Sequence, residues 1–378
     1  MTESEADLAE GMEFFTDAGR LLSETWGVGV RVCRPALVAR RGRAETWRAE
    51  VETSGSASAP ASVIIKRAIV ESDCFFDEFV GLQFIKGLRA IPPAAPEILA
   101  CDLSSRLLVM EDLGDGQSLE DITRFSDTEE RALVDLAVIT GRLHAAAVGR
   151  EAEYERVRET MGVPAQAAVR ATQSAAWLDG LSHVTDVFSV LGIALPPEHE
   201  WKSVARIVAD PGAFLTYTHG DMAPSNCHFG TAGAHLLDFE WSGYRHAFYD
   251  ALFWHIIYPF PPVVIRNADI AYRHTLTNTI PEMSDDAVYE AELTYMCAHH
   301  AFSFVRWWLP AILEQDNETA PGVTSRQMLL YKLDRFAALT MQTGYLEGMG
   351  ACAKSLADVF RSRFPEMEAW SYALIAMK

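Results

Sequence analysis

Three oxygen-bearing side chains stand at set intervals in the middle of the chain. Asp221 is followed after four intervening residues by Asn226, and Asp238 comes twelve residues after Asn226. A carboxylate that accepts or orients a hydroxyl proton, combined with two oxygen ligands for Mg²⁺, is the set of groups that phosphoryl transfer uses. The spacing therefore predicts transfer of a nucleotide phosphoryl group, with Asp221 as the catalytic residue and Asn226 and Asp238 as metal ligands.

The residues around these three have predicted supporting roles. His219 is expected to brace the loop by packing and hydrogen bonding rather than to take the proton. Asp250, which follows Tyr249, is expected to cap the next helix, over residues 251–258, and to hold the backbone at His219 and Gly220. Glu240 is expected to meet a second metal, a metal-bound water or a cationic acceptor.

The combined pattern is His-Gly-Asp, four residues, Asn, then Asp-Phe-Glu and a Tyr-Asp pair. In protein kinases an Arg stands at the place of Gly220 and a Gly at the place of Glu240. With these two departures, the chain over about residues 30–260 resembles the aminoglycoside phosphotransferase and choline kinase superfamily.

The resemblance implies an α+β, bilobal, protein-kinase-like fold. The expected N-terminal lobe, residues 1–112, holds an antiparallel β-sheet, a leading helix and one main helix; the expected C-terminal lobe, residues 113–378, is mainly helical and contains the catalytic segment 217–250. The resemblance also implies ATP as the phosphoryl donor, with GTP left open, together with Mg²⁺ and, as the acceptor, a hydroxyl of an aminoglycoside-, choline- or sugar-like small molecule.

Lys66 lies in a β-branched run, residues 62–70, that predicts a central strand. A lysine among such neighbours has no structural reason to be buried unless an anion meets it. The next predicted helix, residues 73–88, carries Asp77 and Glu78, and either carboxylate could face Lys66. In the kinase scheme this Lys binds nucleotide phosphates and is held by a Glu on that helix, so Lys66 and Glu78 are the predicted pair. The alternative is an edge-strand lysine in solvent.

Two further segments are expected to contact the nucleotide. Between residues 38 and 47 there is a single glycine, Gly42, and backbone N–H groups of residues 42–46 are expected to meet phosphate oxygens, with added positive charge from Arg40, Arg41 or Arg43. The alternative is an ordinary hairpin turn with solvated arginines. The strand over residues 106–111 resembles the last strand before a kinase hinge, which implies adenine contacts from the backbone of Glu111 to Leu113 and from the side chain of Met110.

The acceptor is not named by the sequence. Trp241, Tyr244 and His246 lie near the metal motif and are the predicted pocket residues, together with Glu240. By analogy with the superfamily, helices within residues 150–212 and 285–378 are expected to shape the pocket.

Composition narrows the class of partner. The formal net charge of −20 disfavours nucleic acid and favours a cationic acceptor weakly. Six scattered cysteines, no secretory signal and no apolar stretch long enough to span a membrane predict a cytoplasmic protein with no membrane partner. The oligomeric state is left open.

Two other functions are weighed against the small-molecule kinase. A nucleotide-binding pseudoenzyme or scaffold of the same fold is opposed by the presence of Lys66, Asp221, Asn226 and Asp238 together. A protein kinase is opposed by Gly220, by Glu240 and by the lack of an Ala-Pro-Glu sequence after Asp238.

Overall fold

The computed structural model describes residues 3–55, 59–70, 72–88, 94–125, 128–320 and 322–370. Its N-terminal part is a five-stranded antiparallel sheet with the strand order β1-β2-β3-β5-β4. The elements of this lobe are α1 (Glu3–Trp26), β1 (Val30–Arg41), β2 (Ala44–Thr53), β3 (Ser62–Ala68), α2 (Cys74–Gly87), β4 (Ile98–Asp102) and β5 (Leu107–Glu111).

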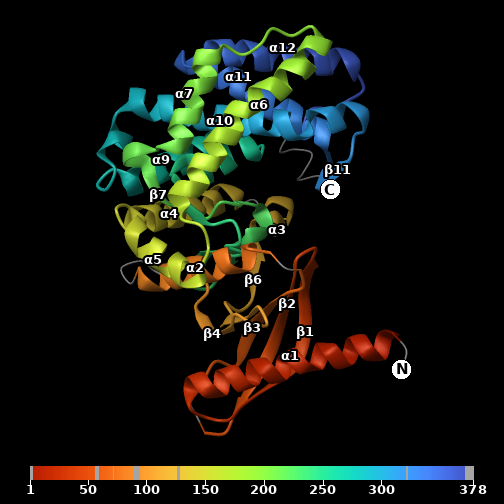
Figure 1. Cartoon of the computed structure of the whole chain (residues 1–378), viewed down its shortest axis with the longest axis vertical. Helices are drawn as coiled ribbons and strands as arrows, with labels where there is room; N and C mark the ends of the chain where they lie inside the picture. The colour runs from red at the N-terminus through yellow and green to blue at the C-terminus, as the bar shows by residue number, and fades with distance from the viewer. Residues whose placement is uncertain are drawn as a thin grey trace.

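The two faces of this sheet pack against different partners. Helix α1 lies across one face (Figure 1), where Phe14, Ala18 and Leu22 form a small core with side chains that include Val63 and Ile65 of β3. Because side chains alternate along a strand, Lys66 projects from the opposite face, toward α2. The alternation of β3 therefore places one lysine inside the molecule, next to a helix.

The rest of the chain is mainly helical and forms the larger lobe (Figure 1). Its helices are α3 (Leu119–Phe125), α4 (Glu129–Ala147), α5 (Glu151–Met161), α6 (Gln166–Leu191), α7 (Glu198–Ala209), α8 (Phe248–Leu252), α9 (Pro262–Leu276), α10 (Asp286–Glu314), α11 (Ser325–Thr343) and α12 (Glu347–Arg363). Its strands are β6 (Gly116–Ser118), β7 (Leu215–Thr218), β8 (Cys227–Gly230), β9 (Gly233–Leu236), β10 (Gly243–His246), β11 (Glu318–Ala320) and β12 (Val323–Thr324). The larger lobe also contains a π-helical turn (Phe253–Ile257) and 3₁₀ turns at Gly212–Phe214, Pro224–Asn226 and Pro281–Ser284.

A single apolar core joins α2 to the helical lobe. The ring of Phe84 on α2 lies 5.3 Å from that of Tyr154 on α5 and 5.2 Å from that of Tyr217 on β7, between ring centroids. All three side chains are buried. Aromatic pairs at such distances add to the free energy of burial, so α2 is anchored on the larger lobe as well as on the sheet.

The predicted α+β fold, with a small antiparallel sheet lobe and a larger helical lobe, is confirmed. The lobe boundary at residue 112 stays a prediction. One local prediction is wrong: the helix near Asp250 begins at Phe248, so Asp250 lies inside α8 and does not cap it. Within the part of the chain that the structure covers, no single helix has the length and apolar character of a membrane span, whereas α4 and α5, bent by 85° at their junction, reach that standard as a pair.

Candidate active site

Lys66 joins the two lobes through two carboxylates. Its Nζ lies 2.7 Å from Glu78 Oε2 on α2 and 2.5 Å from Asp238 Oδ1 in the segment after β9. Glu78 is the partner that faces it, while Asp77 turns the other way and lies 2.6 Å from Arg158 Nη1 on α5. The structure thus brings together three of the predicted site residues from three separate elements.

Burial and charge act against each other in this cluster. Burial by itself lowers the pKa of Lys66, but the carboxylates of Glu78 and Asp238 outweigh it and raise the pKa above the usual value of a lysine. Burial raises the pKa of Glu78, which Lys66 opposes and which the nearby charge of Asp238 reinforces. Lys66 is therefore held as a cation at the meeting point of the two lobes.

Asp221 and Asn226 lie side by side on the loop after β7. The side-chain nitrogen of Asn226 donates to the backbone oxygen of Asp221 at 3.1 Å and approaches its carboxylate at 3.4 Å. The backbone N–H of Leu237 donates to the backbone oxygen of Asn226 at 2.8 Å, at the open end of the β8–β9 hairpin. Since Leu237 immediately precedes Asp238, the hairpin brings the two predicted metal ligands, Asn226 and Asp238, to the same end of β8 and β9.

Asp238 has a left-handed backbone conformation with φ of 67°. Residues other than glycine seldom adopt this conformation, which costs of order 1 kcal/mol or more and tends to occur at functional sites. Asp tolerates it better than most residues. The turn directs the carboxylate of Asp238 to Lys66 across the boundary between the lobes.

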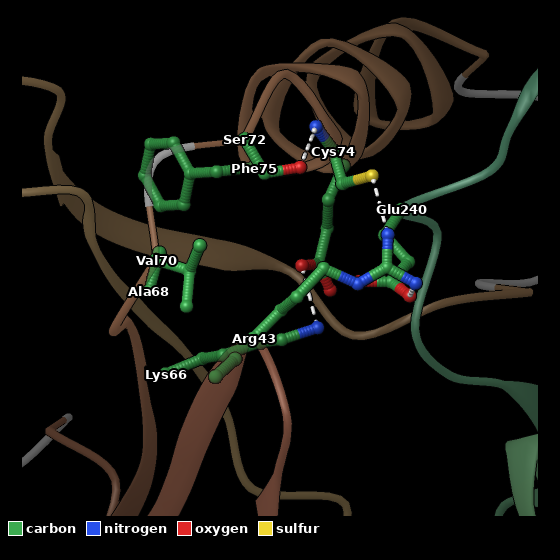
Figure 2. A pocket seen from close by; sticks show the side chains of 10 residues that line it. Arg43, Lys66, Ala68, Val70, Ser72, Cys74, Phe75 and Glu240 are labelled. Carbon is green, nitrogen blue, oxygen red and sulfur yellow. Dashed lines mark hydrogen bonds and ion pairs between the residues drawn. The ribbon is translucent and has the colours of Figure 1, made fainter.

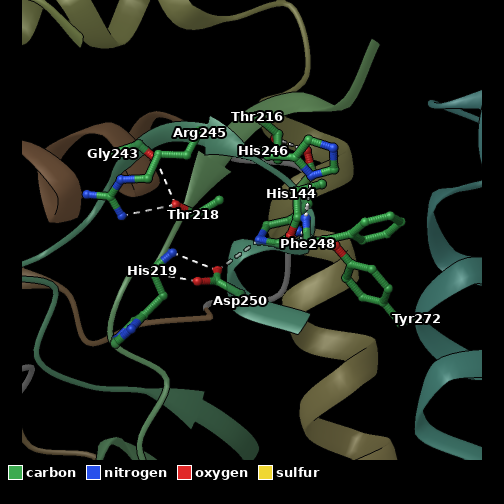
Figure 3. A network of polar contacts seen from close by, with 12 residues as sticks. His144, Thr216, Thr218, His219, Gly243, Arg245, His246, Phe248, Asp250 and Tyr272 are labelled. Carbon is green, nitrogen blue, oxygen red and sulfur yellow. Dashed lines mark hydrogen bonds and ion pairs between the residues drawn. The ribbon is translucent and has the colours of Figure 1, made fainter. Parts of the chain in front are cut away.

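The backbone before Asp221 is fixed by the buried carboxylate of Asp250 (Figure 3). One oxygen accepts the N–H of His219 at 2.7 Å and the other accepts that of Gly220 at 2.9 Å. Nε2 of His144 on α4 lies 2.9 Å from the same carboxylate. Burial alone would raise the pKa of Asp250, but these hydrogen bonds and the histidine lower it. Asp250 ties down the loop as predicted, although it does not cap α8.

His219 lies where the predicted bracing role requires it. Its Nε2 lies 2.8 Å from the backbone oxygen of Leu237, and its ring packs against Phe239 with 4.6 Å between centroids. The ring is fully buried. These contacts join the loop of Asp221 to the loop of Asp238.

Gly220 has φ of 86°, and a side chain there would meet the backbone of Trp241 and the guanidinium of Arg245. The glycine at this position is therefore required by both conformation and space. Arg245 occupies the volume next to the catalytic loop. Its Nη2 donates to the oxygen of Trp241 at 2.5 Å, and its Nη1 lies 3.5 Å from Thr218 Oγ1.

A hollow of about 290 Å³ opens beside Lys66 (Figure 2). The turn between β1 and β2 reaches over it, since Arg43 lies 3.4 Å from Glu240 and stacks on the ring of Trp241 at 5.0 Å. The turn itself is a two-residue hairpin loop, Gly42 and Arg43, between paired Arg41 and Ala44. The turn is a hairpin, but Arg43 is held by Glu240 and Trp241 instead of being solvated, and phosphate contact by Gly42 stays a prediction.

The prediction for the backbone of residues 44–46 is wrong. These residues belong to β2, which pairs with β1 on one side and β3 on the other, so the sheet occupies their backbone groups. Arg43, one of the three arginines expected to add charge near this turn, lines the hollow beside Lys66.

The segment after β5 has the position expected of a hinge. Met110 lies in β5 opposite Ile64 of β3 and is buried, whereas Glu111 and Leu113 are half-buried. The neighbouring Asp112 accepts hydrogen bonds from Arg48 at 2.7 Å and from Ser62 at 2.6 Å. Whether Met110, Glu111 and Leu113 contact a nucleotide base stays a prediction.

The four predicted acceptor residues have different surroundings. Trp241 is 44% exposed, and Glu240 lines the hollow beside Lys66. Tyr244 is fully buried and its hydroxyl donates to the oxygen of Ala147 at 2.7 Å, so its placement in an acceptor pocket is wrong. His246 is buried with Nε2 3.0 Å from Glu292, and it lines a second hollow.

A family model decides the wider classification. The model described as the phosphotransferase enzyme family matches residues 81–283, more than half of the chain, and covers the second half of α2, the catalytic loop and the segment of Asp238. This chain belongs to the phosphotransferase enzyme family (APH). The superfamily predicted from the sequence is confirmed, and the chain is a kinase-like phosphotransferase.

Solved structures of low sequence identity align with most of this phosphotransferase. The streptomycin–ATP–APH(2")-IIa ternary complex is 11% identical, with 78% of this chain and 90% of that chain covered and a TM-score of 0.46. Macrolide 2'-phosphotransferase MphH from Brachybacterium faecium is 16% identical, with coverage of 77% and 91% and a TM-score of 0.47. A choline/ethanolamine kinase family protein from Mesorhizobium loti is 13% identical, with coverage of 85% and 93% and a TM-score of 0.45. No curated protein matches the sequence significantly.

The donor set of the phosphotransferase fits Mg²⁺. Within the described ranges, no three His, Cys, Asp or Glu side chains gather as metal ligands. The predicted pair instead offers the carboxylate of Asp238 and the amide oxygen of Asn226, whose nitrogen is used by Asp221. Magnesium prefers oxygen ligands and usually keeps several waters or phosphate oxygens, so two protein ligands are sufficient.

Sequence reasoning missed the roles of two residues that shape this site. His144 supports Asp250, and Arg245 fills the space next to Gly220. For His144 and Arg245 no local pattern exists, because their partners lie on other elements.

Proposed function

We propose that this phosphotransferase moves the γ-phosphoryl group of ATP to a hydroxyl of a small molecule, with Mg²⁺. The observation that carries the proposal is the bridge from Lys66 on β3 to Glu78 on α2 and to Asp238 beyond β9. A buried cation held between two carboxylates from different lobes, beside an open hollow, is suited to polyphosphate.

Each residue has a distinct part in the reaction. The acceptor oxygen forms a bond to the γ-phosphorus while the bond from that phosphorus to the leaving diphosphate breaks, and Asp221 accepts the hydroxyl proton or orients the hydroxyl. Lys66 donates hydrogen bonds to phosphate oxygens. Asn226 and Asp238 would hold Mg²⁺, which supplies positive charge to the phosphates when bound. Asp250 and His219 keep the loop in position.

The proposal is tested with Asp221→Asn and Asp238→Asn in the full chain. Release of ADP with a mixture of hydroxyl acceptors is expected to fall by about 10²–10⁴-fold in Asp221→Asn, because the proton acceptor is lost. ATP binding by that variant is expected to persist, whereas Asp238→Asn is expected to lose the Mg²⁺ dependence of binding. Asp179→Asn, exposed on α6, is the control. A turnover rate of purified Asp221→Asn equal to that of the unsubstituted chain would refute the proposed mechanism.

A further inference from the structure

A second hollow of this phosphotransferase, of about 250 Å³, is lined in part by Arg245, whose guanidinium approaches Gly220 of the catalytic loop. It is lined by residues of α6, α7 and α10, which lie in the helical segments expected to shape an acceptor pocket, and by residues of β10 and α8. Its lining, as far as the described residues show, contains two guanidinium groups, two imidazoles and an amide but no carboxylate. The polar lining residues are Arg170, Gln173, Arg245, His246, Tyr249 and His299.

Arg170 is built into the wall of the hollow. Only 7% of the residue is exposed. Its Nη1 donates to the carboxylate of Glu151 at 2.7 Å and to the backbone oxygen of Tyr244 at 3.1 Å. Its Nε is buried and has no hydrogen-bond partner. A buried guanidinium with an unused donor is costly unless another group accepts from it.

Arg245 joins the hollow to the site of phosphoryl transfer. Its guanidinium lies against Gly220, the residue before Asp221. Across the described part of the chain it makes no ion pair: its partners are the oxygens of Trp241 and Thr218 and the ring of Tyr249, at 4.9 Å. Its Nε is also buried and unpartnered. Arg245 thus has charge and a donor to offer within reach of the catalytic loop.

The carboxylates near the hollow are already paired. Glu151 is taken by Arg170 at 2.7 Å, and Glu292 accepts from His246 at 3.0 Å. Asp77, whose charge also acts on Arg245, lies 2.6 Å from Arg158. An ammonium group entering the hollow would find no free carboxylate in its lining, whereas an oxyanion would find two guanidinium donors.

The two histidines of the lining add neutral hydrogen-bonding groups. Burial lowers the pKa of His246 and lowers that of His299 to about 4, with the nearby Arg306 adding to the effect on His299. Near neutral pH the positive charge of the lining therefore comes from Arg170, which Glu151 compensates, and from Arg245, which makes no ion pair with the described residues.

We infer that this hollow binds an oxyanion of the acceptor, a carboxylate or a phosphate group, so that the phosphorylated hydroxyl belongs to a small hydroxy acid or phosphorylated alcohol. The inference rests on the proposed function. Paired guanidinium donors recognise such groups with strong, directional hydrogen bonds. It differs from the cationic acceptor favoured by net charge, because the lining of a site determines its ligand more directly than the total charge does.

The inference is tested without nucleotide, so that its failure is separate from failure of phosphoryl transfer. Sodium malonate and inorganic phosphate are titrated into the full chain at constant ionic strength, and the unfolding midpoint reports binding. Protection here means a higher unfolding midpoint. Malonate is expected to protect the chain if the acceptor carries a carboxylate, and inorganic phosphate is expected to protect it if the acceptor carries a phosphate. Absence of protection by both would overturn the inference.

Variants locate the binding. Arg170→Gln and Arg245→Gln are expected to bind the protecting anion about tenfold to a hundredfold more weakly, as for loss of a hydrogen bond to a charged group. Because these arginines also hold their surroundings, Gln173→Glu is the decisive variant: the side chain of Gln173 lines the hollow and makes no described hydrogen bond. It is expected to abolish protection, whereas Thr172→Glu, exposed on the same helix, is expected to leave it unchanged.

Two further results would contradict the inference. If the protecting anion binds Gln173→Glu as well as it binds the natural chain, then it occupies another site, such as the hollow beside Lys66. If kanamycin or choline protects the natural chain and Gln173→Glu strengthens that protection, then the hollow receives a cation. Neither result depends on the outcome for Asp221→Asn, which tests the reaction itself.

Discussion

Lys66 forms ion pairs with carboxylates from both lobes. Its two partners, Glu78 and Asp238, are themselves close enough for the charge of Asp238 to raise the pKa of Glu78. The lysine therefore has two roles. It binds phosphate in the proposed reaction, and its positive charge offsets the free-energy cost of burying the two carboxylates. These two roles can be separated by mutation.

Lys66→Met is expected to destabilise the fold by about 3–5 kcal/mol, because it leaves Glu78 buried without its cation. In Lys66→Met/Glu78→Gln most of that stability is expected to return, while ATP affinity stays low. Urea denaturation and ATP titration measure the two quantities. Lys86→Met, which removes an exposed pair with Glu97, is the control and is expected to cost less than about 1 kcal/mol. An equal loss of stability in the single and double variants would show that Glu78 is not the group left uncompensated.

At the level of elements, the sequence predicted the features that local residue patterns determine, namely the type and order of helices and strands. The strand of Lys66, the helix of Glu78 and their order follow from local periodicity, as do the positions of Asp221 and Asn226 on one short loop. Local patterns do not determine which face of a short strand is buried. Tyr244 lies in a four-residue strand, β10, whose side chains alternate between the core and the catalytic loop, and its burial was therefore missed.

Contacts between distant elements explain the other misses. Asp250 was expected at the start of a helix, but α8 begins two residues earlier, and the carboxylate instead serves the loop after β7. Arg245 reaches Gly220 only because β10 pairs with β7, which the sequence does not reveal. Gly220 stands where protein kinases have an arginine, and the structure adds that an arginine from another strand fills the space beside it.

Gly220→Ala tests how tightly the catalytic loop is packed. The methyl group would meet the oxygen of Trp241 and the guanidinium of Arg245 while the backbone keeps φ of 86°, so we expect a loss of about 2–4 kcal/mol in folding free energy and of nearly all turnover. Gly192→Ala is the matched control, since its φ is 66° but no atom lies within 4 Å of the added methyl group. It is expected to cost about 1 kcal/mol and to leave turnover unchanged. Equal effects of the two substitutions in thermal unfolding would show that crowding at Gly220 is unimportant.

On the scale of the whole molecule, a chain with a net charge of −20 encloses a basic side chain in the core of its larger lobe. Lys332 on α11 is 2% exposed, and its Nζ lies 3.1 Å from His300 Nε2 on α10. Throughout the described ranges neither side chain has a carboxylate partner within ion-pair distance. Burial lowers the pKa of Lys332 to about 7, and burial, with Lys332 adding to the effect, lowers that of His300 well below its usual value. Two basic groups that share one hydrogen bond cannot both be charged at low cost.

This pair makes the stability of the molecule depend on pH. The unfolded chain keeps the proton of Lys332 up to about pH 10.5, whereas the folded chain releases it above about pH 7, so this lysine makes stability rise with pH between those values. Lys332→Met is expected to remove that slope and to raise the unfolding free energy at pH 7.5 by about 2–4 kcal/mol. Urea denaturation at several pH values measures the difference between variant and natural chain, which cancels the tyrosines and cysteines that titrate in the same window. Lys354→Met, at an exposed pair with Asp358, is the control and should leave the slope unchanged. Parallel pH profiles for Lys332→Met and the natural chain would mean that Lys332 is charged in the folded state, with its cost met by groups other than His300.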